Sequence, residues 1–402
     1  MPPSAARIIG AIGDAAARWC DPDFPERVRV AGAIARRTGY SAPVVDHALD
    51  RLFSSITAPA LGAVIAGELG PLEILDAPTP AGQRPRAWAR PLGRVCVISS
   101  RTTVGVALVP AIFALCAKND VLVKDREDRL VTAFFDTLRE ELEYFAHAAH
   151  ARVWDAAAAT EDLANFDAVV AFGRDETLTR IRAGLNADAR FLGYGARASA
   201  GYVAREDCTA RGLPDLYAGA ARDLILYESE GCLSLHVLFV ERGGETEPQD
   251  VARELGRAVE SASVEFPLGQ RDAGAAAAFG NARNMAAFRA AAGSGAVYSD
   301  EACSYAVLFD PPRTQPPAFL PRLLGVFPVA GPDDAAAYLR AHALPLEGFA
   351  LSSARADLVA LATSAGAVRI AHFGALQHPP LTGWHGGRSR IAEFVRWTQA
   401  EI

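Results

Sequence analysis

Short, mostly apolar runs alternate with longer helix-like segments between residues 94 and 195. Each run is too short for a stable helix and resembles a strand that is buried on both faces of a sheet. The runs are RVCVISS (94–100), VLVK (121–124), DAVVAFG (167–173) and ARFLGYG (189–195). This alternation is typical of βαβ units. It predicts a doubly wound parallel sheet with a ligand site at the carboxyl ends of its strands.

A second α/β alternation begins after about residue 208. A helix-like segment at 213–229 precedes GCLSLHVLFVE, and PDDAAAYLRAHA (332–343) has a helical pattern. Three further apolar runs are predicted strands: YAVLFD (305–310), GVFPV (325–329) and VRIAHFG (368–374). The pattern indicates an α/β protein with more than one domain, because single hydrophobic cores stop growing at about 250–300 residues.

The predicted division has three parts. Residues 1–207 contain N-terminal helices and a nucleotide-binding domain, 208–380 form a second domain that contains Cys232, and 381–402 form a closing segment. Residues 70–95 are rich in Pro and Gly, which predicts a loop or an exposed hairpin.

Composition excludes several classes of protein. The 402 residues carry a formal net charge of −7, which argues against a nucleic-acid-binding surface. Six cysteines without a CxxC pair favour neither a disulfide framework nor a zinc site. The longest apolar stretch, 104–117, contains Pro110 and is too short to span a bilayer. Without a signal-peptide pattern, these features predict a cytoplasmic protein with no membrane insertion and no metal.

Cys232 follows Gly231 at the start of a strongly apolar run. A single cysteine beside a buried strand is more often a core residue than a nucleophile, and the core interpretation holds for Cys96 and Cys116. A cysteine nucleophile, by contrast, forms an acyl-enzyme that is itself a thioester and stays electrophilic. Gly231 would let the backbone approach a substrate, and the backbone N–H of Cys232 would help to hold an oxyanion.

The order of these motifs resembles the aldehyde dehydrogenase superfamily. Within it, several segments are similar to the fatty acyl-CoA reductases of the bacterial bioluminescence type, from about residue 90 to the end of the chain. These segments are LVKD, GRDETLTRIR, FLGYGARASAGYVARED, GCLSLHVLFVE and GWHGGRSRIAEFVRW. The resemblance implies an aldehyde dehydrogenase-like fold: a Rossmann-like nucleotide-binding domain, an α/β catalytic domain and a small oligomerisation hairpin within 70–95. It also implies a homo-oligomer.

The resemblance implies a role for Cys232 in catalysis. Cys232 would attack an acyl-CoA or acyl-carrier-protein thioester, and NADPH or NADH would reduce the acyl-enzyme to the aldehyde. Dehydrogenases that form acids carry a glutamate where this chain has FLGYGARAS (191–199), a stretch without a carboxylate. Slow hydrolysis of the acyl-enzyme is therefore expected. Glu228, Glu230 and Glu301 remain alternative bases.

The resemblance also assigns cofactor and oxyanion contacts. Thr102 would supply the second oxyanion donor in place of the family's asparagine. Lys124 would lie near the adenosine ribose. Glu127 would bind the ribose hydroxyls, which indicates NAD, whereas Arg126 would bind a 2′-phosphate, which indicates NADP. The remaining predicted cofactor-binding residues are Ser99, Ser100, Gly173, Thr177 and Gly195.

Alternatives from other classes remain open. An ordinary aldehyde dehydrogenase, an acyl-phosphate reductase and a non-catalytic member that binds a nucleotide or a partner protein are each compatible with the pattern. His236, four residues after Cys232, is more typical of a packed or backbone-bonded histidine than of a base. Trp384 and Trp397, near His385 in the closing segment, are predicted to pack.

Overall fold

A computed structural model describes residues 2–81, 84–101, 103–153, 163–311 and 316–401. The chain forms two compact units. The first contains residues 1–38, 45–196 and 380–402, and the second contains 39–44 and 197–379. The predicted boundary at 207/208 differs from this division, because strand β8 (Ala198–Val203) belongs to the second sheet. The segment 381–402, predicted to be separate, belongs to the first unit.

The N-terminal helices of the first unit surround an aromatic core. Helices α1 (Ala5–Trp19), α2 (Pro25–Thr38), α3 (Ala42–Ser55) and α4 (Ala58–Glu68) confirm the predicted helical character of this region. The Trp19 ring lies 4.9 Å from Phe53 and 6.1 Å from Phe134, between ring centroids. Its indole N–H donates to Thr137 Oγ1 at 3.1 Å, which satisfies the polar end of a fully buried side chain.

The sheet of the first unit has five parallel strands in the order β5-β4-β3-β6-β7. They are β3 (Arg94–Ile98), β4 (Asp120–Lys124), β5 (Ala149–Arg152), β6 (Ala168–Phe172) and β7 (Arg190–Tyr194). Because strand order reverses between β3 and β6, this is a doubly wound sheet with a topological switch point. Helices α5 (Leu108–Cys116), α6 (Leu130–Glu141) and α8 (Asp175–Ala183) connect the strands.

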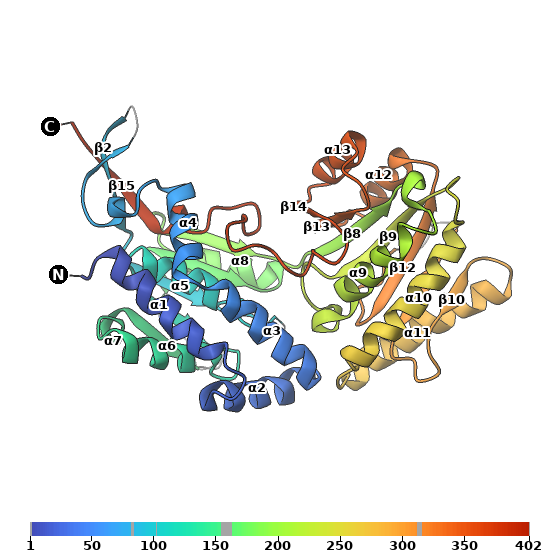
Figure 1. Ribbon diagram of the computed structural model, residues 1–402, viewed down its shortest axis with the longest axis horizontal. Helices are drawn as coiled ribbons and strands as arrows, with labels where there is room; N and C mark the ends of the chain where they lie inside the picture. The colour runs from blue at the N-terminus through green and yellow to red at the C-terminus, as the bar shows by residue number, and fades with distance from the viewer. Residues whose placement is uncertain (1, 82–83, 102, 154–162, 312–315, 402) are drawn as a thin grey trace. The chain divides into compact units, whose positions relative to one another are not determined.

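The Pro- and Gly-rich segment forms the predicted hairpin. After the short helix η1 (Leu72–Leu75), strands β1 (Thr79–Ala81) and β2 (Arg84–Pro91) pair antiparallel. The C-terminal strand β15 (Val395–Ala400) pairs with the other edge of β2 (Figure 1). A role in oligomerisation stays a prediction.

The second unit contains a seven-stranded sheet in the order β10-β11-β12-β9-β8-β13-β14. The strands other than β8 are β9 (Leu235–Glu241), β10 (Ala296–Tyr298), β11 (Ala306–Phe309), β12 (Leu323–Val329), β13 (Leu346–Leu351) and β14 (Arg369–Ala371). Strand β10 pairs antiparallel, and the other strands pair parallel. The sequence patterns predicted neither β8 nor β13.

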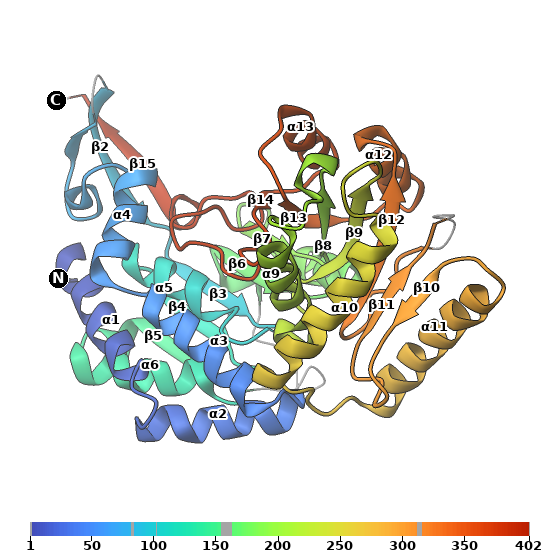
Figure 2. The ribbon, with the colours of Figure 1, turned by 45° about the vertical axis from the view of Figure 1, so that its right-hand side comes forward.

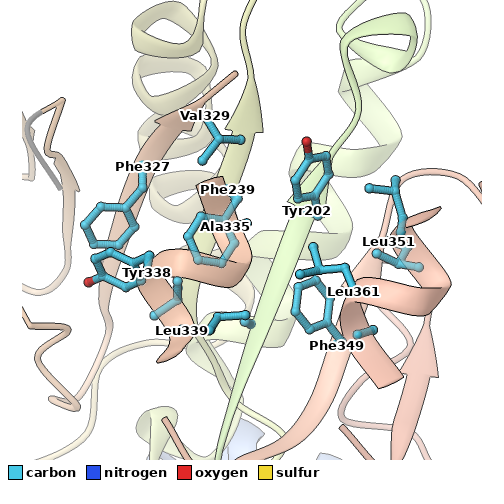
Figure 3. Close-up of a cluster of buried hydrophobic side chains, with 14 of the residues drawn as sticks. Tyr202, Phe239, Phe327, Val329, Ala335, Tyr338, Leu339, Phe349, Leu351 and Leu361 are labelled. Carbon is cyan, nitrogen blue, oxygen red and sulfur yellow. The ribbon is translucent and has the colours of Figure 1, made fainter. Parts of the chain in front are cut away.

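Helices cover the central strands of this sheet. Tyr202, Phe239 and Phe349 project from the strands toward helices α12 (Pro332–Ala341) and α13 (Ala356–Ser364) in a continuous apolar cluster (Figure 3). Helices α9 (Leu213–Ile225) and α10 (Pro248–Glu265) pack on the opposite face (Figure 2). Among the described residues, no single helix is long and apolar enough to cross a membrane; α3 and α4 meet that test only as a pair bent by 62°.

Replacing a ring in this cluster is expected to destabilise the second unit. Phe349 is fully buried, so Phe349→Ala should lower the free energy of unfolding by about 3–5 kcal/mol. Urea unfolding followed by circular dichroism measures the effect, since the tryptophans (19, 88, 154, 384 and 397) lie outside the second unit. Val359→Ala on the outside of α13 is the control and should cost less than 1 kcal/mol. Equal effects of the two substitutions would contradict the assignment of this core.

Candidate active site

Cys232 lies in a turn that enters β9 from its amino end. The side chain of Cys232 is exposed, whereas its neighbours Gly231 and Ser234 are buried. The Ser234 N–H donates to the Gly231 carbonyl at 3.0 Å and closes the turn. The thiol is therefore accessible, although the backbone beneath it belongs to the packed interior.

Three residues from other segments hold this turn. Ser199 Oγ donates to the Cys232 carbonyl at 2.9 Å and accepts from the Gly348 N–H at 3.0 Å. A Cβ at position 348 would lie 2.6 Å from Ser199 Oγ, so glycine is required there. Gln377 Nε2 donates to Ser234 Oγ at 2.8 Å. These bonds fix the backbone of the turn and leave the thiol free to project outward.

The residues just before the turn adopt an unusual conformation. Tyr227, Glu228 and Ser229 all have left-handed backbones, with φ of 56°, 51° and 59°. For residues with a side chain, this conformation costs roughly 1–2 kcal/mol each. Glu228 is buried and forms a two-pronged ion pair with Arg322, at 2.7 and 2.8 Å. The strain is thus stored within a few residues of Cys232, where it is held by buried polar contacts.

The Cys232 thiol is accessible but poorly hydrated. Desolvation raises the pKa of Cys232 to about 12, and the negative charge of Glu347 raises it further, whereas Arg197 opposes the shift. Hydrogen bonds from the backbone N–H groups of Cys232 and Leu233 also oppose it. The exposure of Cys232 allows reagents to reach the sulfur. The raised pKa of the thiol means that the sulfur carries a proton until a reagent arrives. At neutral pH the resting residue is therefore a thiol.

Glu347 and Arg197 were not predicted as site residues. Glu347 is the second residue of β13, and Arg197 immediately precedes β8. Both strands were missed in the sequence, so no signal placed their amino ends beside Cys232. Recognition of β13 from LPLEGFALSS would have placed Glu347 there, because parallel strands begin at the same edge of a sheet.

The three alternative bases occupy different surroundings. Both oxygens of Glu228 accept hydrogen bonds from Arg322, and Oε1 also accepts from the Gly269 N–H at 3.1 Å. Glu230 is exposed and accepts from the Tyr40 hydroxyl at 3.2 Å. Glu301 is exposed in the segment between β10 and β11. Of the three, only Glu228 is buried and ion-paired with an arginine.

His236 has the structural role that its position in the sequence suggests. It is 4 % exposed, and its Nε2 lies 3.0 Å from the Ser229 carbonyl. Burial lowers the pKa of His236 to about 4, so the ring is neutral at physiological pH. It supports the strained segment before Cys232.

A positively charged cavity lies at the carboxyl ends of β4 and β5. It has a volume of about 940 Å³ and is lined by both Lys124 and Arg126. The other cationic residues that line it are Arg37, Arg101, Arg129 and Arg152. Desolvation lowers the pKa of Arg126, and the charges of Arg101 and Arg37 lower it further. Such a concentration of guanidinium groups favours a phosphorylated ligand.

The acidic residues of this region are engaged within the protein. Asp125 accepts from the Thr132 N–H and hydroxyl at 2.9 Å, and Asp128 pairs with Arg37. Glu127 is fully buried and accepts from the backbone N–H groups of Gly105 and Ala107, before α5. Desolvation raises the pKa of Glu127 to about 8. The carboxylate expected to meet a ribose is thus bonded to backbone amides, and its ribose contact stays a prediction.

The other predicted cofactor residues also lie at strand ends of the first unit. Ser99 is fully buried and accepts from the Arg126 N–H at 3.0 Å, so it orders the loop that carries Arg126. Ser100 Oγ accepts from the Thr103 N–H at 3.5 Å. Gly173 and Thr177 lie together where β6 meets α8, and Gly195 follows β7. Thr102 lies outside the described residues. Cys232 belongs to the second unit and these residues to the first.

An aromatic stack attaches the C-terminal segment to the first unit. His385 lies 4.3 Å from Tyr194 with nearly parallel rings, and Tyr194 stacks on Phe172 at 5.0 Å. Burial, assisted by the charge of Arg390, lowers the pKa of His385 to about 4. The prediction that Trp384 and Trp397 pack is wrong, because their side chains are 66 % and 49 % exposed. Within the described ranges, no group of three His, Cys, Asp or Glu side chains can hold a metal ion.

Solved structures share this fold over nearly the whole chain. A NAD-dependent benzaldehyde dehydrogenase from Corynebacterium glutamicum is 14 % identical with a TM-score of 0.69, over 100 % of this chain and 86 % of that one. A glyceraldehyde-3-phosphate dehydrogenase from Methanocaldococcus jannaschii, complexed with NADP, is 10 % identical with a TM-score of 0.71, over 98 % of this chain and 89 % of that one. The predicted aldehyde dehydrogenase-like α/β fold is confirmed.

A longer protein contains the same fold as one part. Bifunctional proline utilization A is 15 % identical with a TM-score of 0.69, and 99 % of this chain covers 42 % of that one. No curated protein matches this chain. The family model described as acyl-CoA reductase (LuxC) matches residues 1–397. The chain therefore belongs to the LuxC family of acyl-CoA reductases, a family of oxidoreductases.

Proposed function

We propose that this protein reduces an acyl thioester to the aldehyde through a covalent bond between the acyl group and Cys232. The observation that carries the proposal is the exposed Cys232 thiol on a rigidly held turn, in a chain of the acyl-CoA reductase family. The sulfur attacks the thioester carbonyl, a new carbon–sulfur bond forms, and the carrier leaves as a thiol with the proton from Cys232. The nicotinamide, when bound, would supply a hydride to the carbonyl carbon of the acyl-enzyme. The carbon–sulfur bond to Cys232 then breaks, which releases the aldehyde and restores the thiol as the proton on the former carbonyl oxygen passes to the sulfur.

The backbone around Cys232 supports acyl transfer. The backbone N–H groups of Cys232 and Leu233 lower the pKa of the Cys232 thiol and so favour its negatively charged form. Donors fixed this close to the attacking atom are suited to a developing oxyanion on the acyl carbonyl. Thr102 remains the proposed second donor.

Formation of the acyl-enzyme is the direct test. Incubation with an acyl-CoA and no reductant should add the mass of one acyl group to the intact protein, and Cys232→Ala should abolish the addition because the nucleophile is missing. Cys303→Ala is the matched control, since Cys303 is partly exposed in the same unit. An adduct that persists in Cys232→Ala, or no adduct in the unmodified protein, would refute the proposal.

Glu347 favours a second candidate reaction, hydrolysis of the acyl-enzyme to an acid. Its charge raises the pKa of the Cys232 thiol, and it precedes Gly348, which donates to Ser199 at the Cys232 turn. A base at this position would activate water. Detection of acid rather than aldehyde as the main product would favour this candidate.

Removing the charge of Glu347 should make the thiol more reactive. Because that charge raises the pKa of Cys232, Glu347→Gln should increase the rate of Cys232 alkylation at pH 8 by roughly two- to fivefold, as expected for one partly solvated charge. Arg197→Gln should decrease the rate by a similar factor. Iodoacetamide labelling, measured on the Cys232 peptide, distinguishes the two directions. A decrease in Glu347→Gln would show that the carboxylate activates the thiol instead.

For the cofactor we propose NADPH rather than NADH. The support is the cavity lined by Lys124 and five arginines, together with the engagement of Glu127 by backbone amides. A 2′-phosphate would add negative charge to this basic cavity, whereas a ribose hydroxyl would gain little from it. Arg126 and Arg152 are both exposed at the edge of this cavity.

Cofactor selectivity tests this assignment. Arg126→Ala and Arg152→Ala should each raise the KM for NADPH by about tenfold or more, because a hydrogen bond to a charged group is worth about 1.5–3 kcal/mol. The KM for NADH should change by less than about twofold. Arg257→Ala, on the exposed face of α10, is the control. Equal changes for the two cofactors would refute a 2′-phosphate site.

The substrate is proposed to be acyl-CoA, with acyl-carrier protein as the alternative thioester. We also propose a homo-oligomer, built through the sheet of β1, β2 and β15. Strand β15 lies at the edge of that sheet, and Trp397 on it is 49 % exposed. An open strand edge with an exposed aromatic side chain is suited to pairing with a second copy.

A further inference from the structure

We infer that Glu228 and Arg322 are positioning residues for Cys232: their buried ion pair holds the segment before the nucleophile in its left-handed conformation. This inference rests on the proposed role of Cys232 as the nucleophile. It deepens that role by naming what determines where the sulfur lies.

The first observation is the backbone itself. Tyr227, Glu228 and Ser229 are three consecutive non-glycine residues with positive φ, and Arg322 has a φ of 54°. A run of such residues persists only when surrounding contacts determine it. The run ends two residues before Gly231, so its conformation sets the direction in which the chain enters the Cys232 turn.

The second observation is how completely this segment is bonded. Ser229 Oγ donates to the Leu224 carbonyl at 2.6 Å and accepts from the Arg322 N–H at 2.9 Å. His236 Nε2 lies 3.0 Å from the Ser229 carbonyl. Side-chain and backbone atoms of Ser229 are thus held from three directions. Glu228 is held just as firmly by the guanidinium of Arg322.

The third observation is the position of Arg322. Its side chain is fully buried, and Nη2 donates to the carbonyls of Phe266 and Pro267 at 2.9 and 3.1 Å as well as to Glu228. One guanidinium therefore joins the strained segment to the chain that leaves α10. Gly269 N–H completes the set by donating to Glu228.

A buried ion pair contributes little net free energy to stability. The desolvation of two charges offsets much of their attraction, and apolar replacements are often equally stable. The planar two-pronged geometry instead fixes the relative orientation of the two groups. At this place in the chain, fixed orientation has a chemical use, because a displacement of about 1 Å at a reacting atom costs roughly 100-fold in rate.

Loss of the pair should affect two reactions of Cys232 in opposite directions. In Arg322→Ala the turn relaxes toward solvent, so iodoacetamide alkylation should become about tenfold faster at pH 8 and its pH midpoint should fall. Acylation by acyl-CoA in a single turnover should slow by roughly 100-fold, with little change in the concentration that gives half the maximal rate. A merely structural role would lower the active fraction and leave the alkylation midpoint unchanged.

Chemical rescue of Arg322→Ala and two more conservative substitutions complete the test. Guanidinium ion at about 50 mM should enter the space left in Arg322→Ala and reverse both changes, whereas sodium chloride at equal ionic strength should not. If Arg322→Ala fails to fold, Glu228→Gln and Arg322→Lys should show smaller changes in the same directions. Arg205→Ala is the matched control: it removes a partner of the buried Glu241 at the other end of β9, and both reactions should stay within twofold.

The outcomes separate this inference from the proposed function. Absence of any acyl adduct in the unmodified protein refutes the proposed function. The alkylation rate of Cys232, and the reversal of its change by guanidinium, need no substrate and therefore still test the role of the Glu228–Arg322 pair. Folded variants with the alkylation midpoint of the unmodified protein, or changes that guanidinium does not reverse, would overturn the inference.

Discussion

In a parallel sheet every strand begins at the same edge, and this constraint determines the surroundings of Cys232. Strand β9 pairs parallel with β8 and β12, so the turn that enters β9 lies beside the beginnings of its neighbours. Ser199 is the second residue of β8, and Arg322 immediately precedes β12. Residues that are distant in sequence therefore meet at one edge of the sheet.

The two sheets use opposite edges. In the first unit, the residues considered for the cofactor follow the carboxyl ends of β3, β4, β6 and β7, as expected for a doubly wound sheet. In the second unit, Cys232, Ser199 and Gly348 lie at the amino ends of β9, β8 and β13. The carboxyl end of β9 carries Glu241, which pairs with Arg205 and Arg355. If both proposed sites are correct, the general rule about carboxyl ends describes the first unit and does not describe the second.

The elements that could be predicted from the sequence are those that a short stretch of residues identifies by itself. The runs at β3, β4, β6 and β7 were found because continuous apolar character over a few residues is itself the signal. Strands β8 and β13 escaped because ASAGYV and LEGFAL mix small, polar and apolar residues without a clear period. That omission moved the domain boundary and hid Arg197 and Glu347. No local pattern identifies the pairing of Glu228 with Arg322, since its partners are 94 residues apart.

The central claim is that Cys232 receives the acyl group before any hydride transfer. The most direct measurement is the release of free CoA after rapid mixing with an acyl-CoA in the absence of NADPH and NADH. The account predicts a burst close to one thiol per active site, and no burst in Cys232→Ala. Release of CoA only after a reductant is added would contradict it.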